Sequence, residues 1–350
     1  MAEKTFPGSG CEPVPKPDNP ALAVSAARLS LRDMNSSDCG KVSPGLRSDC
    51  PEGQPHPVTF EARVEETARW AAQELRHALP PRFDRWFGRF VVHAFRRQLG
   101  RFAGNAIRFD EMIAEEGFAG ASRWMIRNTK AVLEVRGAHG LPVRGPLAIA
   151  ANHPGLLDAL AIAGSLPRED FRIVAEEHPL WGILNQARQR MLLIGKSPQD
   201  RPRAARQLLR HLRGGGCLLL FPSGKIDPDP AVHGVGQTNP ADWSASLDLV
   251  CRTVPGVTVV PALVSGVLSP SAMSHPLARL QPDLGKRRWL AATLEFLNGA
   301  DAPFAMSVQY GEPCILDNAA PASAKAGAAL TVRRRMAEML KSFGSSPRPR

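Results

Sequence analysis

The sequence lacks the features that mark several familiar protein classes. Its six cysteines, at positions 11, 39, 50, 217, 251 and 314, include no Cys-x-x-Cys pair. Neither a zinc knuckle nor a disulfide framework is therefore indicated, and scattered single cysteines are typical of a reducing compartment. No stretch is a convincing membrane span, because the best one, 147–166, carries Asn152, His153 and Asp158 in its middle, where lipid would make them costly. We therefore expect a cytoplasmic protein.

Acidic residues are too few to balance the basic ones. The 350 residues include 44 Lys and Arg against 33 Asp and Glu, which gives a net charge of +11. The hydrophobic fraction of 43% is that of a globular protein, so wholesale disorder is excluded. The excess charge indicates an anionic partner, and nucleic acid, phosphorylated small molecules and anionic lipid headgroups all qualify.

The first 59 residues differ from the rest of the chain. They hold nine of the 32 prolines, and Phe6 is their only aromatic residue. They show no sustained apolar period, and no apolar core follows a basic start, so a signal peptide is not indicated. We expect a disordered leader over 1–59, a helical segment over 60–129 and a main domain over 130–345.

Two helices are predicted at the start of the folded part. Residues 61–79 have helical spacing and end at Pro80-Pro81. Residues 82–102 form the second helix, whose two faces differ. Aromatic side chains share one face, namely Phe83, Trp86, Phe87 and Phe90, and basic side chains line the other, namely Arg82, Arg85, Arg89, His93 and Arg96. Such a helix suits an anionic membrane surface, but a core helix with a solvated basic face has the same pattern.

From residue 132 onward, apolar strands alternate with helices. The predicted strands are 132–136, 147–151, 171–175, 191–194, 217–221, 257–264 and 304–309, and the predicted helices are 156–165, 180–188, 202–213 and 328–343. Continuously apolar strands between helices are typical of a parallel sheet that is covered on both faces. We therefore expect an α/β fold with a mostly parallel central sheet flanked by helices.

The first motif with chemical potential is Asn152-His153-Pro154-Gly155-Leu156-Leu157-Asp158. It follows a strand and leads into a helix. A carboxylate on one imidazole nitrogen fixes the tautomer and leaves the other nitrogen as a base. No Ser or Cys lies nearby in sequence as a nucleophile, so the base would act on a substrate hydroxyl or on water. The alternative is a capping histidine and a solvated aspartate.

The second motif is Phe221-Pro222-Ser223-Gly224-Lys225. A buried strand runs into a sharp turn that exposes backbone N–H groups and a lysine, which can cradle a phosphate. It is not a Walker loop, because no glycine lies five residues before Gly224. An ordinary tight turn is the alternative. A basic stripe precedes this motif on one predicted helix, Arg203, Arg206, Arg210 and Arg213, and a solvated helix face would look the same.

In order and spacing, these motifs resemble the glycerolipid acyltransferase superfamily, best known from 1-acylglycerol-3-phosphate O-acyltransferases. Asn152, His153 and Asp158 match its N-H-x-x-x-x-D motif, and Phe221, Pro222 and Gly224 match part of F-P-E-G-T. Two further matches complete the order, Lys196 with Arg201 as the basic residues of a middle motif, and Val259-Val260-Pro261 as a hydrophobic strand with proline. The resemblance covers about 130–315 and ends at Tyr310-Gly311-Glu312-Pro313. Ser223 stands in place of the usual Glu, and Lys225-Ile226 in place of Thr-Arg, which leaves the acceptor open.

The resemblance implies direct acyl transfer. His153, oriented by Asp158, would take the proton of a lipid hydroxyl that attacks acyl-CoA or acyl-carrier protein, and no metal or other cofactor is expected. Substrate binding is implied for Asn152, Lys196, Arg201, Phe221, Pro222, Ser223, Gly224 and Lys225. Turn N–H groups near 153–155 or 222–224 would hold the oxyanion.

The partners expected from this resemblance are a lysophospholipid or related acceptor, the acyl donor and an anionic membrane surface at the inner face, without nucleic acid. Two rivals stay open. A thioesterase or lipid hydrolase would use the same His–Asp pair with water. A non-catalytic lipid- or nucleic-acid-binding protein would bind by charge and would not depend on His153.

Overall fold

The computed structural model describes residues 59–83, 86–166, 168–195, 197–298, 304–316 and 322–345. All of them lie in the compact unit Pro57–Arg350. The leader predicted over 1–59 lies outside the described residues, apart from Thr59. In the described part of the chain, no helix is both long enough and apolar enough to cross a membrane.

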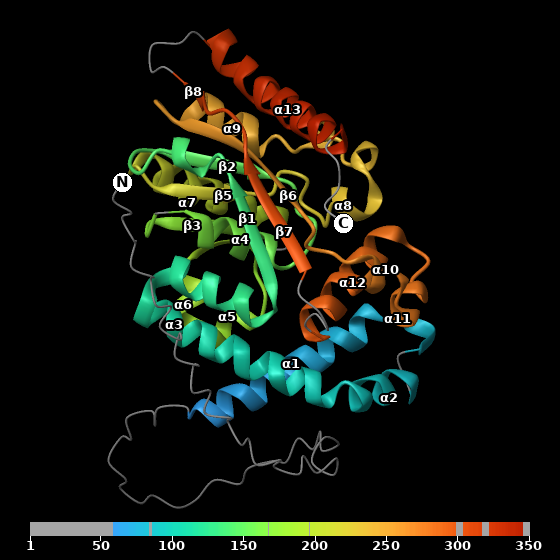
Figure 1. The fold of residues 1–350 in the computed structure, drawn as a ribbon. Helices are drawn as coiled ribbons and strands as arrows, with labels where there is room; N and C mark the ends of the chain where they lie inside the picture. Colours follow the sequence, from blue (N-terminus) through green and yellow to red (C-terminus); the bar gives the residue numbers. More distant parts are fainter. Residues whose placement is uncertain are drawn as a thin grey trace, which may run out of the picture. The chain divides into compact units, whose positions relative to one another are not determined.

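The described strands form one sheet with the order β1-β7-β6-β2-β5-β3-β4 (Figure 1). Their bounds are β1 Ala131–Arg136, β2 Leu147–Ala151, β3 Phe171–Glu176, β4 Met191–Ile194, β5 Cys217–Leu220, β6 Thr258–Ser265, β7 Phe304–Tyr310 and β8 Cys314–Ile315. From β6 to β4 all neighbours are parallel. β7 and β8 run antiparallel to β6, and β1 runs parallel to β7. The predicted, mostly parallel sheet is confirmed. The seven predicted strands have ends within one residue of those expected, whereas β8 was not predicted.

The helices of the described residues are α1 Phe60–Ala78, α2 Trp86–Ala94, α3 Arg96–Asn128, α4 Asp158–Ser165, α5 Leu180–Ile183, α6 Asn185–Gln189, α7 Arg201–Arg213, α8 Pro230–His233, α9 Ser246–Thr253, α10 Pro270–Ser274, α11 Pro276–Arg279, α12 Leu284–Asn298 and α13 Ala322–Ser345. Pro80 and Pro81 follow the end of α1, as predicted, because a proline cannot continue the helical hydrogen bonding.

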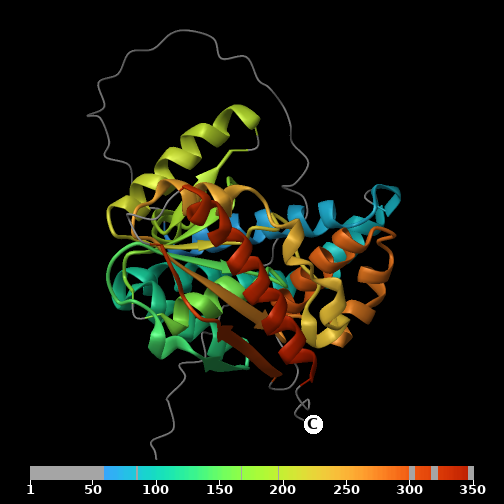
Figure 2. The ribbon, with the colours of Figure 1, turned by 90° about the horizontal axis from the view of Figure 1, so that it is seen from above.

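Both faces of the sheet are buried, which explains why its central strands are continuously apolar. All five residues of β2 and all four of β5 are buried. Ile149 and Leu219 point into a core shared with α3, α4 and α6, and Ala148 and Leu218 point into a second core shared with α7, α9 and α13. Figure 2 shows α3 and α4 on one side of the sheet and α7 on the other.

A third core lies outside the sheet. It joins apolar residues of α1 and α2 to those of α10, α11 and α12. Leu268 belongs to it, and the partly buried Leu156 packs against it. Leu156 follows β2 and Leu268 follows β6, so these helices pack against the loops at the carboxyl ends of the two strands (Figure 1).

The single helix predicted over 82–102 is wrong in its bounds. The helix is interrupted at Phe95, so that α2 ends at Ala94. A second helix, α3, begins at Arg96 and continues to Asn128, with a kink at Gly117. The extension follows from burial, because Ala103, Ile107 and other residues of α3 pack into the cores. The aromatic face is divided as well. Trp86 is 79% exposed and Phe90 is 61% exposed, whereas Phe87 is half-buried against the third core.

Candidate active site

Three loops meet where neighbouring parallel strands end. The loop after β2 carries His153, the loop after β5 carries Phe221, and Gly266 follows β6. Because β2 lies between β5 and β6, their carboxyl ends open at the same edge. In open α/β sheets this edge is where ligands bind.

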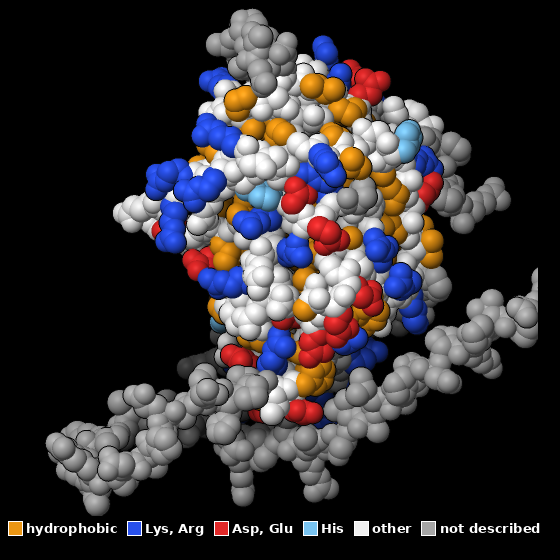
Figure 3. All heavy atoms as spheres, turned by 90° about the vertical axis from the view of Figure 1, so that its left-hand side faces the viewer, with side chains coloured by type: hydrophobic (Ala, Val, Ile, Leu, Met, Phe, Trp, Pro, Cys, Tyr) orange, Lys and Arg blue, Asp and Glu red, His pale blue; other side chains and the backbone are white. Residues whose placement is uncertain are grey.

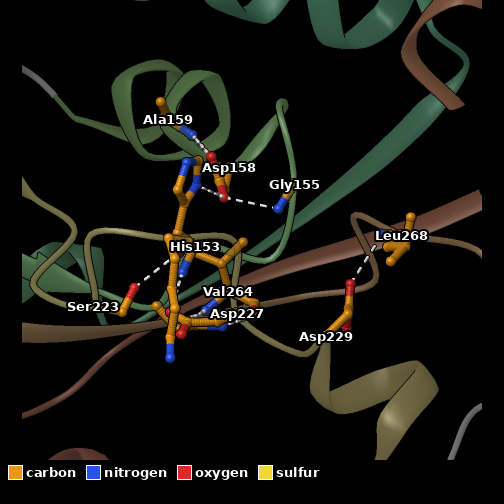
Figure 4. A network of polar contacts seen from close by, with 11 residues as sticks. His153, Gly155, Asp158, Ala159, Ser223, Asp227, Asp229, Val264 and Leu268 are labelled. Atoms are coloured by element: carbon orange, nitrogen blue, oxygen red, sulfur yellow. Dashed lines mark hydrogen bonds and ion pairs between the residues drawn. The ribbon is translucent and has the colours of Figure 1, made fainter. Parts of the chain in front are cut away.

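His153 and Asp158 face each other across the start of α4 (Figure 4). The Nδ1 atom of His153 lies 2.7 Å from Oδ2 of Asp158. Asp158 is fully buried, whereas the His153 side chain keeps 24% of its surface exposed. No described residue forms a hydrogen bond with the second ring nitrogen, Nε2. The imidazole is therefore anchored at Nδ1 and open at Nε2.

Asp158 is itself held by the backbone of its own loop. Its Oδ2 accepts the N–H of Gly155 at 3.1 Å, and its Oδ1 accepts the N–H of Ala159 at 2.7 Å. A carboxylate with these donors is a pure acceptor, so the proton between it and His153 belongs to Nδ1. This fixes the tautomer that leaves a lone pair on Nε2.

Two opposing influences act on the basicity of His153. Burial disfavours the charged imidazolium, but the negative charge of Asp158 and its hydrogen bond favour it, and the charge of Asp227 adds to them. The pKa of His153 is raised above its ordinary value, because the two carboxylates outweigh burial. The open Nε2 is therefore a stronger base than that of a free histidine.

The second motif packs directly on the first. The ring of Phe221 stacks on the imidazole of His153, with centroids 4.2 Å apart and an angle of 18° between the planes. Phe221 follows the last residue of β5, so strand pairing places it there. The stacking fixes the plane of the imidazole ring, and the hydrogen bond to Asp158 fixes the rotation of the ring within that plane.

Asp227 ties the two loops together through the backbone and was not singled out from the sequence. Its Oδ2 accepts the N–H of His153 at 2.9 Å, and its own N–H donates to the carbonyl of His153 at 2.7 Å. Burial raises the pKa of the Asp227 carboxyl, although the hydrogen bond from the His153 N–H and the positive charges of His153 and Lys225 oppose the shift. The signal that could have revealed it is Asp-Pro-Asp-Pro at 227–230, directly after the turn.

Asp229, the second acid of that run, is fully buried and organises the neighbouring loop. Its Oδ1 caps α8 through the N–H of Ala231 and also accepts the N–H of Gly266, and its Oδ2 accepts the N–H of Leu268 at 2.9 Å (Figure 4). Burial raises its pKa, opposed by these backbone donors. Asp229 thus fixes the loop after β6 against the loop after β5.

The remaining predicted residues of the first two motifs lie at this edge with differing roles. The Asn152 amide is fully buried and pairs with both backbone groups of Val264, at 2.8 and 2.7 Å, so it joins β2 to β6. Pro222 is buried. The Ser223 hydroxyl donates to the carbonyl of Lys225 at 2.9 Å, and Lys225 is exposed. Gly224 has a φ of +64°, a left-handed conformation that favours glycine in this turn.

Among the described residues, no hydrogen bond or ion pair joins the middle motif to this site. Lys196 lies outside the described residues. Arg201 begins α7 and is exposed, next to the edge strand β4. Binding roles for these two residues stay predictions. No group of three or more His, Cys, Asp or Glu in the described ranges is arranged to hold a metal ion.

The class of the protein follows from comparison with known families. The family model described as Acyltransferase matches residues 132–265, a segment that runs from β1 to the end of β6 and contains the loops after β2 and β5, but ends just before the loop that follows β6. Residues 132–265 therefore match an acyltransferase domain, and the predicted class of enzyme, an acyltransferase, is confirmed.

Among solved structures, the chain is similar to the crystal structure of the 1-acyl-sn-glycerophosphate (LPA) acyltransferase PlsC from Thermotoga maritima. The identity is 16% and the TM-score 0.41, and the alignment covers 83% of this chain and 100% of that one. No curated protein matches the chain.

Proposed function

We propose that the protein transfers a fatty acyl group from acyl-CoA or acyl-carrier protein to a hydroxyl of a lysophospholipid or a related lipid. The observation that carries the proposal is the His153–Asp158 pair, with Nδ1 bound to a buried carboxylate at 2.7 Å and Nε2 open. This arrangement inside an acyltransferase domain suits a general base that acts on a substrate hydroxyl.

In the proposed step, Nε2 of His153 takes the proton of the acceptor hydroxyl as its oxygen attacks the thioester carbonyl. The imidazolium that forms is stabilised by Asp158. The tetrahedral intermediate then expels the thiolate, which takes up the proton from His153. The Ser223 hydroxyl is not poised as a nucleophile, because it donates to the Lys225 carbonyl.

The oxyanion of the intermediate needs donors, and most N–H groups in the two turns are already occupied. Pro154 and Pro222 have none. The N–H of His153 is bound to Asp227, that of Gly155 to Asp158 and that of Gly224 to the Phe221 carbonyl. The N–H of Ser223 has no partner among the described residues, so we propose it as the oxyanion donor.

The basic stripe on α7 supports a role for an anionic acyl donor. Arg203, Arg206 and Arg210 are exposed and form no ion pair with a described residue. Figure 3 shows Lys and Arg side chains gathered at the left of the face on which α7 lies. Such a surface attracts the phosphates of coenzyme A or an acidic carrier protein.

The lipid acceptor requires access to a bilayer, and α2 offers a surface for it. Trp86 and Phe90 are exposed large apolar side chains, and basic groups follow them at the junction with α3, where His93, Arg96, Arg97 and Arg101 line a hollow. Aromatic side chains beside arginines favour peripheral attachment to an anionic membrane. We propose attachment at the inner face, in the cytoplasm.

The direct test is an acyl-transfer assay on the purified protein, with acyl-CoA and acyl-carrier protein as donors and a panel of lyso-lipids as acceptors. The expected result is an esterified lipid whose formation depends on the acceptor. Release of free fatty acid at the same rate with and without acceptor would instead identify the protein as a thioesterase.

A further inference from the structure

Two side chains on helices that pack around the site take no part in the proton transfer proposed above. They are His233, the last residue of α8, and Arg288 in the first half of α12. Neither belongs to a motif of the sequence analysis, and Arg288 lies beyond the segment matched by the family model.

The loop after β6 holds α8 and α12 in place around the site. Asp229 caps α8 and binds the N–H groups of Gly266 and Leu268. Glu295 of α12 accepts the N–H of Ser269 at 3.1 Å and also its hydroxyl. Both helices are therefore fixed to the same four-residue loop, whose first residue follows β6.

Helix α12 also packs against the loop that carries His153. A Cβ atom built on Gly155 would lie 2.7 Å from Cγ1 of Val267 and 3.9 Å from Cβ of Ala292. Ala292 thus faces the loop between His153 and Asp158. Arg288 precedes Ala292 by four residues, which places it one turn away on the same face of the helix.

The Nε atom of Arg288 is a buried donor that has no hydrogen-bond partner among the described residues. His233 differs, because its Nδ1 donates to the carbonyl of Asp229 at 3.3 Å, which leaves Nε2 without a proton. Arg288 forms no ion pair with a described residue. Burial lowers its pKa, whereas the charges of Asp227 and Asp283 oppose the shift, and the charge of Arg288 in turn contributes to a lowered pKa of His233, behind burial. The guanidinium is thus within electrostatic range of both His233 and the acid that binds the His153 backbone.

We propose that Arg288 binds a phosphate group of a substrate close to the loop that carries His153. A half-buried guanidinium without a carboxylate partner can bind phosphate oxygens through two parallel N–H donors. Buried donors without acceptors are destabilising, and a bound anion would satisfy them. The proposal rests on the proposed function for the nature of the substrates, of which both the acceptor lipid and coenzyme A can carry phosphate.

The test measures binding without turnover, by calorimetry on the full chain, with four probes. Glycerol 3-phosphate is compared with glycerol, and coenzyme A with pantetheine. Arg288→Gln should weaken one phosphate probe about tenfold or more and leave its phosphate-free counterpart unchanged. An effect on glycerol 3-phosphate assigns the site to the acceptor, and an effect on coenzyme A assigns it to the donor. Arg288→Lys should lose part of the affinity, because an ammonium is a point charge without the planar fork.

Lys286→Gln is the matched control, since Lys286 is exposed on the same helix and the charge change is equal. Its affinities should stay at the wild-type level. Wild-type affinity of Arg288→Gln for both phosphate probes, or an equal loss in Lys286→Gln, would overturn the proposal. If Arg288→Gln does not fold, a folded Arg288→Lys with undiminished affinity for both probes would also overturn it. The experiment measures binding and not turnover. A failure to find acyl transfer would therefore count against the proposed function but would not decide whether Arg288 binds phosphate.

Discussion

Asp158 determines both the orientation and the basicity of His153, and these two effects can be separated by the pH dependence of the rate. The base must be neutral at Nε2 to accept a proton, so activity falls as pH decreases through the pKa of His153. Because the two carboxylates raise this pKa above its ordinary value, the loss begins at a higher pH than for a free imidazole.

Asp158→Asn removes the charge that contributes most to raising this pKa. The acid limb of kcat/KM should therefore move to lower pH, and the rate at the optimum should fall by about 10²-fold or more, because the tautomer is no longer fixed. A pH–rate profile of both proteins measures the shift. An acid limb that stays in place in Asp158→Asn would show that another group titrates.

At this scale the sequence allowed the pair to be predicted, and the resemblance added Phe221, but neither indicated Asp227 or the contacts that these residues make with His153. His153 and Asp158 are five residues apart across a strand end and a helix start, so local geometry brings them together. Phe221 and Asp227 reach His153 only because β5 pairs with β2. That pairing joins segments about 70 residues apart, and a single sequence carries no signal for it.

The elements around the site are fixed by close packing, and Gly155 is one of the tightly packed positions. A Cβ there would meet Val267 Cγ1 at 2.7 Å, whereas one at Gly140 would meet nothing within 4 Å. Gly155→Ala should destabilise the fold by about 1–3 kcal/mol and lower activity by moving the loop that holds His153. Gly140→Ala should change the unfolding free energy by no more than about 0.5 kcal/mol. Urea unfolding and acyl transfer, measured on both, would contradict the packing argument if the two variants behaved alike.

Helix α2 combines exposed and half-buried aromatic side chains, so it can be tested in two parts. Trp86→Ser with Phe90→Ser should reduce flotation with anionic liposomes about tenfold or more and leave the circular dichroism unchanged, because both side chains are exposed. Phe87→Ser should lower the melting temperature, because Phe87 packs against the third core. Unfolding of the double variant would support the core interpretation of this helix. Unchanged flotation would place the membrane contact elsewhere.

The strands were easier to predict than the helices, and burial explains the difference. Strands covered on both faces are continuously apolar, as in 147–151 and 217–220, and such runs are visible in the sequence. Helices α10 and α11 are short and begin at Pro270 and Pro276, so they carry little helical period. Both helices pack into the third core, and Glu295 binds Ser269 at the start of α10. These contacts join residues that are far apart in the sequence, so local patterns do not reveal them.

For the whole molecule, the sequence predicted the class of sheet but not the strand order. The antiparallel insertion of β7 between β6 and β1 follows from which strands pair, a property that apolar patterns leave open. The net positive charge predicted an anionic partner, and the structure shows where basic groups gather. The exposed arginines of α7 and the basic junction of α2 and α3 both lie in the unit Pro57–Arg350.

Activity and stability should therefore belong to that unit. Removing residues 1–55 should change the melting temperature by no more than a few degrees and leave acyl transfer near the full-length rate, because the sequence of this segment offers almost nothing to bury. Thermal unfolding and the transfer assay on the truncated and full-length proteins test this. A large fall in melting temperature would show that the leader contributes to the fold.

The central claim is that His153 is the general base of acyl transfer, and one variant pair tests it most directly. In His153→Ala and His153→Gln, Asp158 keeps its hydrogen bonds from Gly155 and Ala159, so the loop should stay folded and acyl-CoA should still bind. Single-turnover acyl transfer to the lyso-lipid acceptor that the wild-type protein uses should fall by about 10²–10⁴-fold in both, with unchanged melting temperature. Near-normal transfer by a folded His153→Ala protein would contradict the account.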